Sequence, residues 1–512
     1  MEITQPLHRA AQLTPTAPAT VMGDRVRTVA ESVDRIARLA AGLISNGLQR
    51  GNRVAIMSLN SDTFHEALLG IPWAGGAVVP VNYRWSAAEI GFSLDECGVE
   101  ILIVDDAFLP LVDAVREHYS GLTTIVHTGD APTPDGALDY EQLLADTAPV
   151  EDARRGGDEI YGIFYTGGTT GSPKGVTLTH DNMMASAYGC VASGEFMTTG
   201  GRLMHAAPMF HLADICAWTG GLLLGATHVF VPAFTPAGAL ATLAEQHVTD
   251  TLLVPTMIQM LVDSPEAMNA DVSEVRHIMY GASPMSEAVL ARARALFTGA
   301  TFLQLYGMSE LSPVATMLTM ADHDDPVHRS SAGRAAPHTE VKIVDEEDNE
   351  VPRGTVGQIV VRGAATMVGY WNRPKETEEA LRGGWMHTGD GGYMDDDSFV
   401  FVVDRIKDMI ITGGENVYSI EVENVISKHP SIATSAIIGL PDDKWGERVH
   451  AVVVLQPGAA LELDDLQQFS REMIAGYKIP RSMTIVDALP LSAAGKVLKR
   501  DLRAELIAPA HA

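Results

Sequence analysis

The sequence predicts an α/β protein, in which a large N-terminal domain of layered sheets and helices with a β subdomain precedes a small α+β C-terminal domain. Three observations support this fold class. Short β-rich apolar runs alternate with helical stretches along the first part of the chain, which favours parallel strands. From residue 340 the pattern changes to strand alternation around an acidic turn, which is typical of an antiparallel sheet. A polar segment at 404–408 then separates this part from a small α+β domain expected at 409–512.

The N-terminal elements follow from their residue patterns. Thr28 and Glu31 form a capping-box pattern at the start of a helix expected over 28–47, where apolar residues recur at helical spacing. The apolar stretch 218–231 is too short for a membrane span and is expected to form a buried hairpin or a helix–strand pair. Further expected elements are a helix at 64–69 and strands at 53–57, 78–81, 101–104, 123–126, 251–255, 277–280 and 301–305.

The C-terminal part of the chain separates at the polar segment Asp-Arg-Ile-Lys-Asp, residues 404–408. We place the main boundary there, with an N-terminal domain at 1–403 and a C-terminal domain at 409–512. The C-terminal domain is expected to contain helices at 420–428 and 463–475, strands at 434–438 and 449–455, and a polar tail.

Composition and charge exclude several classes of protein. Of 512 residues, 36 are Lys or Arg and 65 are Asp or Glu, which gives a formal net charge of −29. General binding to nucleic acid or to an anionic membrane rests on basic patches, so this charge argues against both. A local site for an anionic small molecule is still compatible with it. Hydrophobic residues at 46% and charged residues at 20% exclude wholesale disorder.

The cysteines and the N-terminus favour a cytoplasmic protein. Cys97, Cys190 and Cys216 are too few and too scattered for a disulfide framework or a zinc cluster, which favours a reducing compartment. The first residues lack a basic segment followed by an apolar one, and no run approaches about 18 consecutive apolar residues. We therefore expect neither a signal peptide nor a membrane span.

The most informative motif is Tyr-Thr-Gly-Gly-Thr-Thr-Gly-Ser-Pro-Lys-Gly at residues 165–175. Glycines let the backbone approach a ligand closely. Successive N–H groups and hydroxyls can then cradle phosphate oxygens, while Lys174 adds a positive charge. The order of Pro173, Lys174 and Gly175 is not that of a Walker A loop, and the glycines do not fit the dinucleotide fingerprint. Because apolar residues precede it, a strand–loop–helix phosphate site is favoured over a surface loop.

This loop resembles the signature loop of the adenylate-forming superfamily, which includes acyl-CoA synthetases, aryl-CoA ligases, peptide-synthetase adenylation domains and luciferases. Further motifs match in order over nearly the whole chain, and the resemblance is closest to bacterial fatty-acyl-CoA synthetases. Relatives usually have serine where this chain has Gly167, so one hydroxyl is lost here. The resemblance implies that the loop binds the ATP phosphates through Thr166, Gly167, Gly168, Thr169, Thr170, Gly171 and Lys174.

Two later motifs imply the adenine and metal contacts. In the motif at 304–310, the resemblance implies that Tyr306 stacks on adenine and that Ser309 reaches the α-phosphate or the substrate carboxylate. Glu310 would hold Mg²⁺, together with Thr170 of the loop. Relatives more often have threonine at the place of Ser309, and both residues supply a hydroxyl. The remaining implied ATP and AMP contacts are Gly281, Ala282, Ser283, Gln304, Leu305 and Gly307.

The motifs near the domain boundary imply a ribose site and a hinge. Asp390, in a Thr-Gly-Asp motif, would accept hydrogen bonds from the paired ribose hydroxyls, and Arg405 would be the second ribose or phosphate contact. Lys407 falls at the position of the family's hinge, which assigns 404–408 as the hinge of a mobile C-terminal domain.

The C-terminal domain carries two further matches. Gly413 and Gly414 would let the backbone approach the pantetheine arm of CoA, whereas Ile411 stands where many relatives have lysine. Lys496 matches the C-terminal catalytic lysine, whose ammonium group would neutralise charge where carboxylate and phosphate meet.

The segment around His211 narrows the class of substrate. Peptide-synthetase domains usually have Phe-Asp where this chain has Phe210 and His211, as acyl- and aryl-CoA ligases do. His211 is expected to line the acyl pocket and to gate the access of CoA. For Asp214 a structural role is favoured over contact with an amine or hydroxyl of the substrate. The expected acyl pocket comprises His211, Trp218, Tyr280, Gly281 and Met308, within 208–218, 279–283 and 305–317.

The resemblance implies an AMP-forming acid–thiol ligase that uses ATP, CoA and Mg²⁺. It would activate a fatty acid of medium or long chain as acyl-AMP and transfer the acyl group to CoA. Its catalytic residues would be Lys496, Glu310, Lys174 and His211. Such a reaction needs no side-chain nucleophile, which agrees with the lack of a G-x-S-x-G motif in the sequence.

Several alternatives stay open. They are an aryl-CoA ligase of the cinnamate or benzoate type, transfer to a carrier protein in trans, a luciferase-like oxidation, and a non-catalytic regulator that binds acyl groups or nucleotides. The presence of Lys174, Glu310, Asp390 and Lys496 argues against the regulator. The expected partners are small molecules rather than nucleic acid or a membrane. The sequence leaves the oligomeric state open, a homodimer included.

Overall fold

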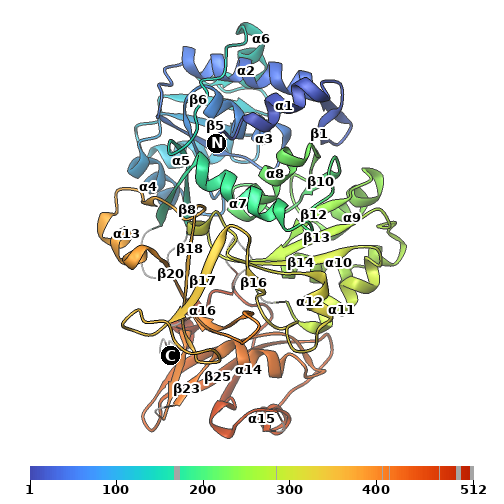
Figure 1. Cartoon of the computed structure of the whole chain (residues 1–512), viewed down its shortest axis with the longest axis vertical. Helices are drawn as coiled ribbons and strands as arrows, with labels where there is room; N and C mark the ends of the chain where they lie inside the picture. The colour runs from blue at the N-terminus through green and yellow to red at the C-terminus, as the bar shows by residue number, and fades with distance from the viewer. Residues whose placement is uncertain are drawn as a thin grey trace.

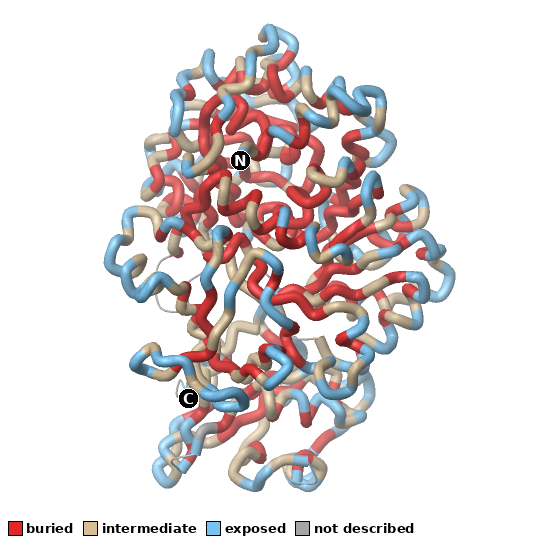
Figure 2. Tube along the Cα trace, in the orientation of Figure 1, coloured by how far each residue is buried: buried red, intermediate tan, exposed pale blue. Residues whose placement is uncertain are grey.

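The computed structural model describes residues 1–166, 173–283, 285–405, 408–413, 415–471, 473–491 and 497–507, with the backbone alone for Arg405 and Asn416. The described strands form three sheets in a large N-terminal part and a fourth in the smaller C-terminal part. Figure 1 shows these parts at opposite ends of the long axis, with the N-terminal elements in blue and the C-terminal ones in orange and red. Buried backbone follows the sheets through the middle of the molecule (Figure 2).

An eight-stranded sheet lies in the N-terminal part. Its order is β19 (Gly369–Tyr370), β9 (Lys174–Thr179), β8 (Ile160–Thr166), β4 (Ala77–Pro80), β3 (Arg53–Met57), β5 (Ile101–Asp105), β6 (Thr124–Thr128) and β7 (Leu138–Asp139). Neighbouring strands from β8 to β7 are parallel, whereas β9 runs antiparallel to β8 and β19. The helices of this region are α1 (Gln5–Leu13), α2 (Val29–Ser45), α3 (Asp62–Trp73), α4 (Ala87–Cys97), α5 (Val112–Arg116) and α6 (Tyr140–Asp146).

A nine-stranded sheet forms the second layer. Its order is β16 (Arg334–Ala335), β15 (Thr316–Leu318), β14 (Thr301–Tyr306), β13 (His277–Gly281), β12 (Asp250–Leu253), β10 (Arg202–His205), β11 (Thr227–Phe230), β1 (Pro18–Met22) and β2 (Arg25–Thr28). The run from β14 to β1 is parallel. Its helices are α7 (His180–Ala192), α8 (Leu212–Leu224), α9 (Pro236–Glu245), α10 (Pro255–Asp263), α11 (Glu287–Leu296) and α12 (Met320–Asp324).

The expected β subdomain is an antiparallel four-stranded sheet, which confirms the prediction from residue 340 onward. It consists of β17 (Thr339–Val344), β18 (Gly357–Gly363), β20 (Met386–Met394) and β21 (Val400–Arg405), with α13 (Pro374–Ala380) before β20. The C-terminal part contains β22 (Ile410–Thr412), β23 (Glu415–Val417), β24 (Ile432–Asp442), β25 (Gly446–Leu455) and β26 (Ser482–Ile485), with helices α14 (Ser419–Ile426), α15 (Leu463–Arg471) and α16 (Lys499–Ile507).

Local sequence signals account for most of these elements. The Thr28 hydroxyl accepts a hydrogen bond from the Glu31 N–H, and the Glu31 carboxylate accepts one from the Thr28 N–H, so the predicted capping box starts α2. The stretch 218–231 is the end of α8 followed by β11, which confirms a helix–strand pair. The expected polar tail contains a strand and a helix that the sequence did not predict, since β26 pairs with β25 and α16 buries Leu502.

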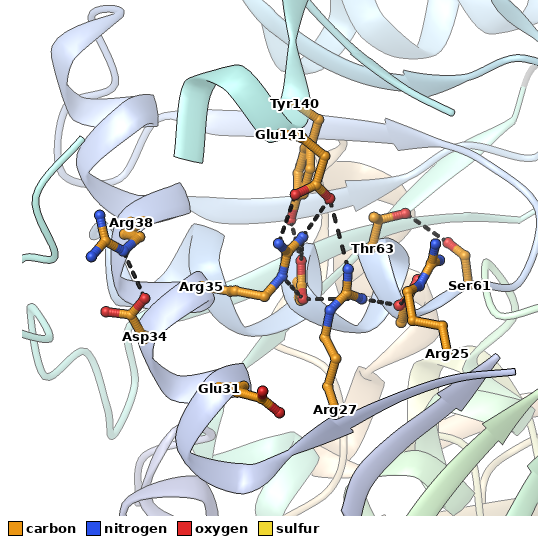
Figure 3. Close-up of polar contacts among 12 residues, drawn as sticks. Arg25, Arg27, Glu31, Asp34, Arg35, Arg38, Ser61, Thr63, Tyr140 and Glu141 are labelled. Atoms are coloured by element: carbon orange, nitrogen blue, oxygen red, sulfur yellow. Dashed lines mark hydrogen bonds and ion pairs between the residues drawn. The ribbon is translucent and has the colours of Figure 1, made fainter. Parts of the chain in front are cut away.

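A group of charged side chains around two buried carboxylates joins β2, α2, α3 and α6 (Figure 3). Arg35 donates to the carboxylate of Glu66 at 2.6 Å, and the Tyr140 hydroxyl donates to the same carboxylate at 2.7 Å. Asp62 accepts from two arginines of β2 and, like Glu66, is 1% exposed. We call this group the N-terminal ion cluster; it comprises Arg25, Arg27, Arg35, Asp62, Glu66, Tyr140 and Glu141.

Candidate active site

Parallel strands of the nine-stranded sheet place expected site residues at their carboxyl ends. β10 leads to His211, the N-cap residue of α8. β13 ends at Gly281, and β14 ends at Tyr306 shortly before a 3₁₀ turn, η3 (Ser309–Leu311). Because β10, β12, β13 and β14 are parallel neighbours, these ends lie along one edge of the sheet. Ligands bind at this edge in open α/β sheets.

Glycines allow the backbone to pack closely along this edge. A Cβ atom at Gly281 would lie 2.1 Å from the carbonyl oxygen of Leu305, and one at Gly307 would lie 2.0 Å from that of Pro313. Neither position can take a side chain without a shift of the backbone. Ala282 has a φ of 68°, in the left-handed region that residues with a side chain rarely adopt.

Tyr280 and Gln304 lie opposite one another in β13 and β14. The Tyr280 hydroxyl lies 3.3 Å from the Gln304 side-chain oxygen and 2.7 Å from His323 Nε2. Burial raises the pKa of Tyr280, so its hydroxyl stays protonated. Contacts with Gln304 and His323 therefore hold the Tyr280 side chain in place. Three other expected site residues, Ser283, Met308 and Ser309, are half-buried at the same edge of the sheet.

The predicted phosphate loop joins two antiparallel strands, β8 and β9. Thr166 and Lys174 are opposite one another in this pairing and mark its two ends. Gly167, Gly168, Thr169, Thr170 and Gly171 lie outside the described residues. The predicted helix is α7, but it follows β9 rather than the loop itself, which makes this a strand–loop–strand arrangement.

Lys174 and Glu310 both contact Tyr370. The Lys174 ammonium nitrogen lies 4.9 Å from the centroid of the Tyr370 ring, within the range of a cation–π contact. The Tyr370 hydroxyl donates a 2.7 Å hydrogen bond to the carboxylate of Glu310. Glu310 is a buried residue, 5% exposed. Burial, followed by the charge of Glu310, raises the pKa of Tyr370, so the hydroxyl remains a donor.

The residues around Glu310 are compatible with Mg²⁺. Mg²⁺ prefers oxygen ligands and is usually held by one or two carboxylates together with substrate phosphates. Glu310 offers such a carboxylate beside the phosphate loop. Within the part of the chain that the structure describes, no three His, Cys, Asp or Glu side chains gather into a metal-binding group. A metal here would therefore depend on the phosphates of a bound nucleotide.

A hydrogen bond connects the expected adenine and ribose residues. The Tyr306 hydroxyl donates to the Asp390 carboxylate at 2.8 Å. Asp390 lies in β20, where its N–H donates to the Thr388 hydroxyl at 3.1 Å. Arg405 is the partner of Asp390 in the β20–β21 pairing, although its side chain is outside the described part. The structure thus brings together Tyr306 and Asp390, which are 84 residues apart in the sequence.

His211 stands at the start of α8 and packs against its neighbour in the chain. Its ring centroid lies 4.2 Å from that of Phe210, and its backbone N–H donates to the Pro208 carbonyl at 3.0 Å. The residue as a whole is half-buried. His211 is therefore the residue just before the first turn of α8, in the segment that follows β10.

Buried histidines occupy the interior beside α8. The Asp214 carboxylate accepts from His205 Nδ1 at 2.7 Å, and His205 Nε2 lies 2.9 Å from His228 Nδ1. Asp214 is fully buried, which agrees with the structural role favoured from the sequence. The Trp218 indole N–H donates to His65 at 2.9 Å, so this expected pocket residue is anchored in the core.

The C-terminal part contributes one described residue to the expected CoA face. Gly413 has a φ of 62° and donates its N–H to the Trp445 carbonyl at 2.7 Å. A Cβ atom at Gly413 would lie 2.9 Å from the Trp445 ring. The expected residues Lys407, Gly414 and Lys496 lie outside the described residues.

Sequence reasoning missed two residues that contact the site. Tyr370 bonds Glu310 and faces Lys174, and Glu96 of α4 accepts a hydrogen bond from Tyr165 at 2.9 Å. Tyr370 precedes a Trp-Asn-Arg-Pro turn, and this local signal could have drawn attention to it. Glu96 has no such signal, because its partners are distant in the sequence.

The arrangement defines a class of enzyme. Beyond the end of the parallel strand β14 lies a buried carboxylate, Glu310, which shares Tyr370 with Lys174 of the phosphate-type loop. Tyr306 of β14 bonds a second carboxylate, Asp390, of the four-stranded sheet. This arrangement fits an adenylate-forming enzyme. Comparison with known families agrees. The model of the AMP-binding enzyme family matches residues 7–371, and that of the AMP-binding enzyme C-terminal domain matches residues 421–496. The chain belongs to the AMP-binding enzyme family and is an acid–thiol ligase.

Relatives differ in the acid and in the acceptor that their names state. A feruloyl-CoA synthase from Amycolatopsis sp is 37% identical over 498 residues, covering 97% of each chain. The fatty acid–[acyl-carrier-protein] ligase ScoC from Streptomyces coeruleorubidus is 35% identical over 499 residues, covering 96% of this chain and 94% of that one. The crystal structure of ATP-bound MatB from Rhodopseudomonas palustris has a TM-score of 0.89 at 29% identity and covers 99% of both chains.

These comparisons support an acyl- or aryl-CoA ligase that uses ATP and CoA. They leave the class of acid open. Among the residues that the structure describes, no helix is long and apolar enough to cross a membrane.

Proposed function

We propose that the enzyme activates a fatty acid of medium or long chain with ATP and transfers the acyl group to CoA. The observation that carries this proposal is the position of Asp214. The Asp214 carboxylate is fully buried and bound through Oδ2 to His205, which supports a structural role for it rather than contact with the α-amine of an amino acid. An acid without an amine is therefore favoured. The fatty acid ligase from Streptomyces coeruleorubidus supports a fatty acid, and the feruloyl-CoA synthase supports CoA as acceptor.

Two alternatives have specific support. An aromatic acid of the cinnamate or benzoate type is favoured by the feruloyl-CoA synthase, which is 37% identical along nearly the whole chain. Transfer to a carrier protein in trans is favoured by the carrier-protein ligase, which is 35% identical.

The first step forms an acyl-adenylate. A carboxylate oxygen of the acid attacks the α-phosphorus of ATP, a new P–O bond forms, and the bond to the bridging oxygen breaks as pyrophosphate leaves. Lys174 and Lys496 would place ammonium groups where negative charge gathers, which lowers the barrier without a side-chain nucleophile. When bound at Glu310 and Thr170, Mg²⁺ would offset further phosphate charge.

Nucleotide binding would depend on the strand ends described above. Tyr306 would stack on adenine and Asp390 would accept from the ribose hydroxyls, with their mutual hydrogen bond setting the distance between the two subsites. Ser309 would reach the α-phosphate or the carboxylate. The full set of proposed ATP and AMP contacts is Thr166, Gly167, Gly168, Thr169, Thr170, Gly171, Lys174, Gly281, Ala282, Ser283, Gln304, Leu305, Tyr306, Gly307, Ser309, Asp390 and Arg405.

The second step forms the thioester. The sulfur of CoA attacks the acyl carbonyl carbon, and AMP leaves with the electrons of the broken C–O bond. We assign His211 to the acyl pocket and to the access of CoA, and Gly413 with Gly414 to the pantetheine arm. Between the steps, a C-terminal domain at 409–512 would turn about Lys407 within the hinge 404–408 against an N-terminal domain at 1–403.

Release of AMP that depends on CoA tests this proposal. The enzyme is incubated with Mg·ATP, CoA and a panel of straight-chain fatty acids, cinnamic and benzoic acids, and amino acids. A Lys496→Ala variant runs beside Lys428→Ala, a matched control on an exposed surface of the same domain. The proposal expects turnover with fatty acids of medium or long chain, a loss of at least a hundredfold in Lys496→Ala and no loss in the control. Turnover confined to aromatic acids, or pyrophosphate release without CoA-dependent AMP release, would favour the alternatives.

A further inference from the structure

Glu96, in the last turn of α4, binds two segments that come from distant parts of the chain. Its carboxylate accepts from the Tyr165 hydroxyl at 2.9 Å and from Arg373 Nε and Nη2 at 3.0 and 2.7 Å. Its backbone carbonyl accepts from the Trp371 indole N–H at 3.0 Å and from the Asn372 side-chain amide at 3.1 Å. The Glu96 side chain is 13% exposed, so the ion pair with Arg373 is largely shielded from water.

Both segments that Glu96 holds adjoin the phosphate loop. Tyr165 precedes the loop in β8, and it is the partner of Gly175 in the β8–β9 pairing. The backbone N–H of Trp371 donates to the Gly175 carbonyl at 2.7 Å. Tyr370, the next residue back along the chain, contacts Lys174 and Glu310. Through these contacts Glu96 reaches both strands that support the loop.

Local helix stability does not explain a glutamate at this position. The C-terminal end of a helix carries partial negative charge, so a carboxylate in the last turn is disfavoured by the helix dipole. Glu96 lies one residue before the end of α4, and Gly98 caps that end in the left-handed conformation. Its partners outside the helix must therefore account for the position of its carboxylate.

We propose that Glu96 is a positioning residue for the adenylation step, which fixes the strands of the phosphate loop through its hydrogen bond with Tyr165 and its ion pair with Arg373. This inference rests on the proposed function, because it assumes that the loop binds the triphosphate of ATP. Glu96 itself touches no substrate. Its loss should weaken the binding of MgATP while leaving the steps without a triphosphate intact.

Two variants separate this role from general support of the fold. Glu96→Gln removes the charge but keeps the size of the side chain, and Tyr165→Phe removes only the hydroxyl that donates to Glu96. Asp95→Asn is the matched control, because it removes the same charge from the neighbouring, exposed residue of α4. Each protein is assayed for the KM of MgATP in pyrophosphate release and for thioester formation from a supplied acyl-adenylate and CoA. Calorimetry gives the Kd of MgATP, and thermal unfolding confirms the fold.

The proposal expects a rise of tenfold or more in the KM and Kd of MgATP for Glu96→Gln and Tyr165→Phe. Thioester formation from the supplied adenylate should stay within twofold of the wild type, and Asp95→Asn should match the wild type. The double variant should lose less than the sum of the two single losses, because both changes act on the same contact between Tyr165 and Glu96.

Two results would overturn the inference. One is an unchanged Kd for MgATP in both variants with only a lower unfolding temperature, which would make Glu96 a purely structural residue. The other is an equal loss in both half-reactions. A wild-type protein that binds MgATP but turns over no acid would instead contradict the proposed function, and the Kd values of the variants would still decide the role of Glu96.

Discussion

The Tyr306 hydroxyl donates a 2.8 Å hydrogen bond to the carboxylate of Asp390, and this bond connects two sheets. Tyr306 ends β14 in the nine-stranded sheet, whereas Asp390 lies in β20 of the four-stranded sheet. The proposed adenine and ribose contacts therefore have a fixed separation before a nucleotide binds. Such preorganisation reduces the entropy that binding must cost.

Removal of this hydrogen bond should weaken ATP binding. Tyr306→Phe keeps the aromatic ring but loses the donor to Asp390. Because the bond exists before ATP binds, its loss acts through preorganisation alone, and we expect the KM of ATP to rise by about three- to tenfold. Steady-state kinetics at saturating acid and CoA measure this change. Tyr393→Phe is the control, because Tyr393 lies in the same strand as Asp390 and stacks on Phe401. Equal KM values for Tyr306→Phe and the wild type would contradict this role.

A side chain at Gly307 should distort the edge of the site. The added Cβ in Gly307→Ala would lie 2.0 Å from the Pro313 carbonyl oxygen, so the backbone after β14 must shift. We expect a loss of stability of about 1–3 kcal/mol and a large loss of kcat/KM. Gly476→Ala is the control, since its Cβ would meet nothing within 4 Å. Thermal unfolding and turnover are measured for both. Wild-type activity in Gly307→Ala would show that the site tolerates this shift.

Buried histidines should make the protein less stable in mild acid. Burial lowers the pKa of His65 to about 3 and the pKa values of His180 and His450 to about 4. In the unfolded chain these pKa values are about 6.5, so below that pH the unfolded state binds more protons than the folded state. Stability should then fall as the pH drops from about 6.5 toward 4. Between pH 7.5 and 5.5 each histidine should cost about 1.4 kcal/mol.

His450 offers a test of this pH dependence. Its Nδ1 lies 2.7 Å from the Ser482 hydroxyl, a contact that asparagine can reproduce. His450→Asn should reduce the difference in unfolding free energy between pH 7.5 and 5.5 by about 1.4 kcal/mol. Chemical unfolding at the two pH values measures it. An unchanged difference would mean that His450 is not neutral and buried in the folded state.

The N-terminal ion cluster should stabilise the fold only while its charges are paired. Glu66 is 1% exposed and accepts from Arg35 and Tyr140, so Glu66→Ala leaves a buried guanidinium without this partner. Removal of one member of a buried pair costs about 3–5 kcal/mol. Glu141→Ala removes a carboxylate that is 61% exposed and bonds the same Arg35, and should cost about 1 kcal/mol or less. Unfolding curves compare the two, and similar losses would contradict the difference in burial.

The elements that the sequence predicted well have local signals. The capping box of Thr28 and Glu31 and the apolar strand at 53–57 depend on residues close in the chain, and both occur where expected. The C-terminal strand β26 was missed because its hydrogen bonds come from β25, about 30 residues earlier. The helix expected at 463–475 is α15 (Leu463–Arg471), which is shorter.

In the candidate site, too, the sequence predicted the residues that belong to local motifs but not the contacts between distant segments. Lys174, Tyr306, Glu310 and Asp390 belong to motifs with a recognisable order, and the structure joins Tyr306 to Asp390 and joins Lys174 to Glu310 through Tyr370. The contacts among them follow from topology instead. The distance in sequence between Glu96 and Arg373 is 277 residues, and no local pattern predicts that they pair. The same holds for Cys190 and Cys216, whose sulfur atoms lie 4.0 Å apart in the interior although the residues are scattered in the sequence.

The fate of a carboxylate oxygen tests the central claim most directly. A turnover reaction is run with Mg·ATP, CoA and a straight-chain fatty acid whose carboxylate carries ¹⁸O, and the products are analysed by mass spectrometry. Attack of the carboxylate on the α-phosphorus predicts one ¹⁸O atom in each AMP formed and none in pyrophosphate. Label in phosphate with release of ADP, or AMP without label, would contradict activation of the acid as an acyl-adenylate.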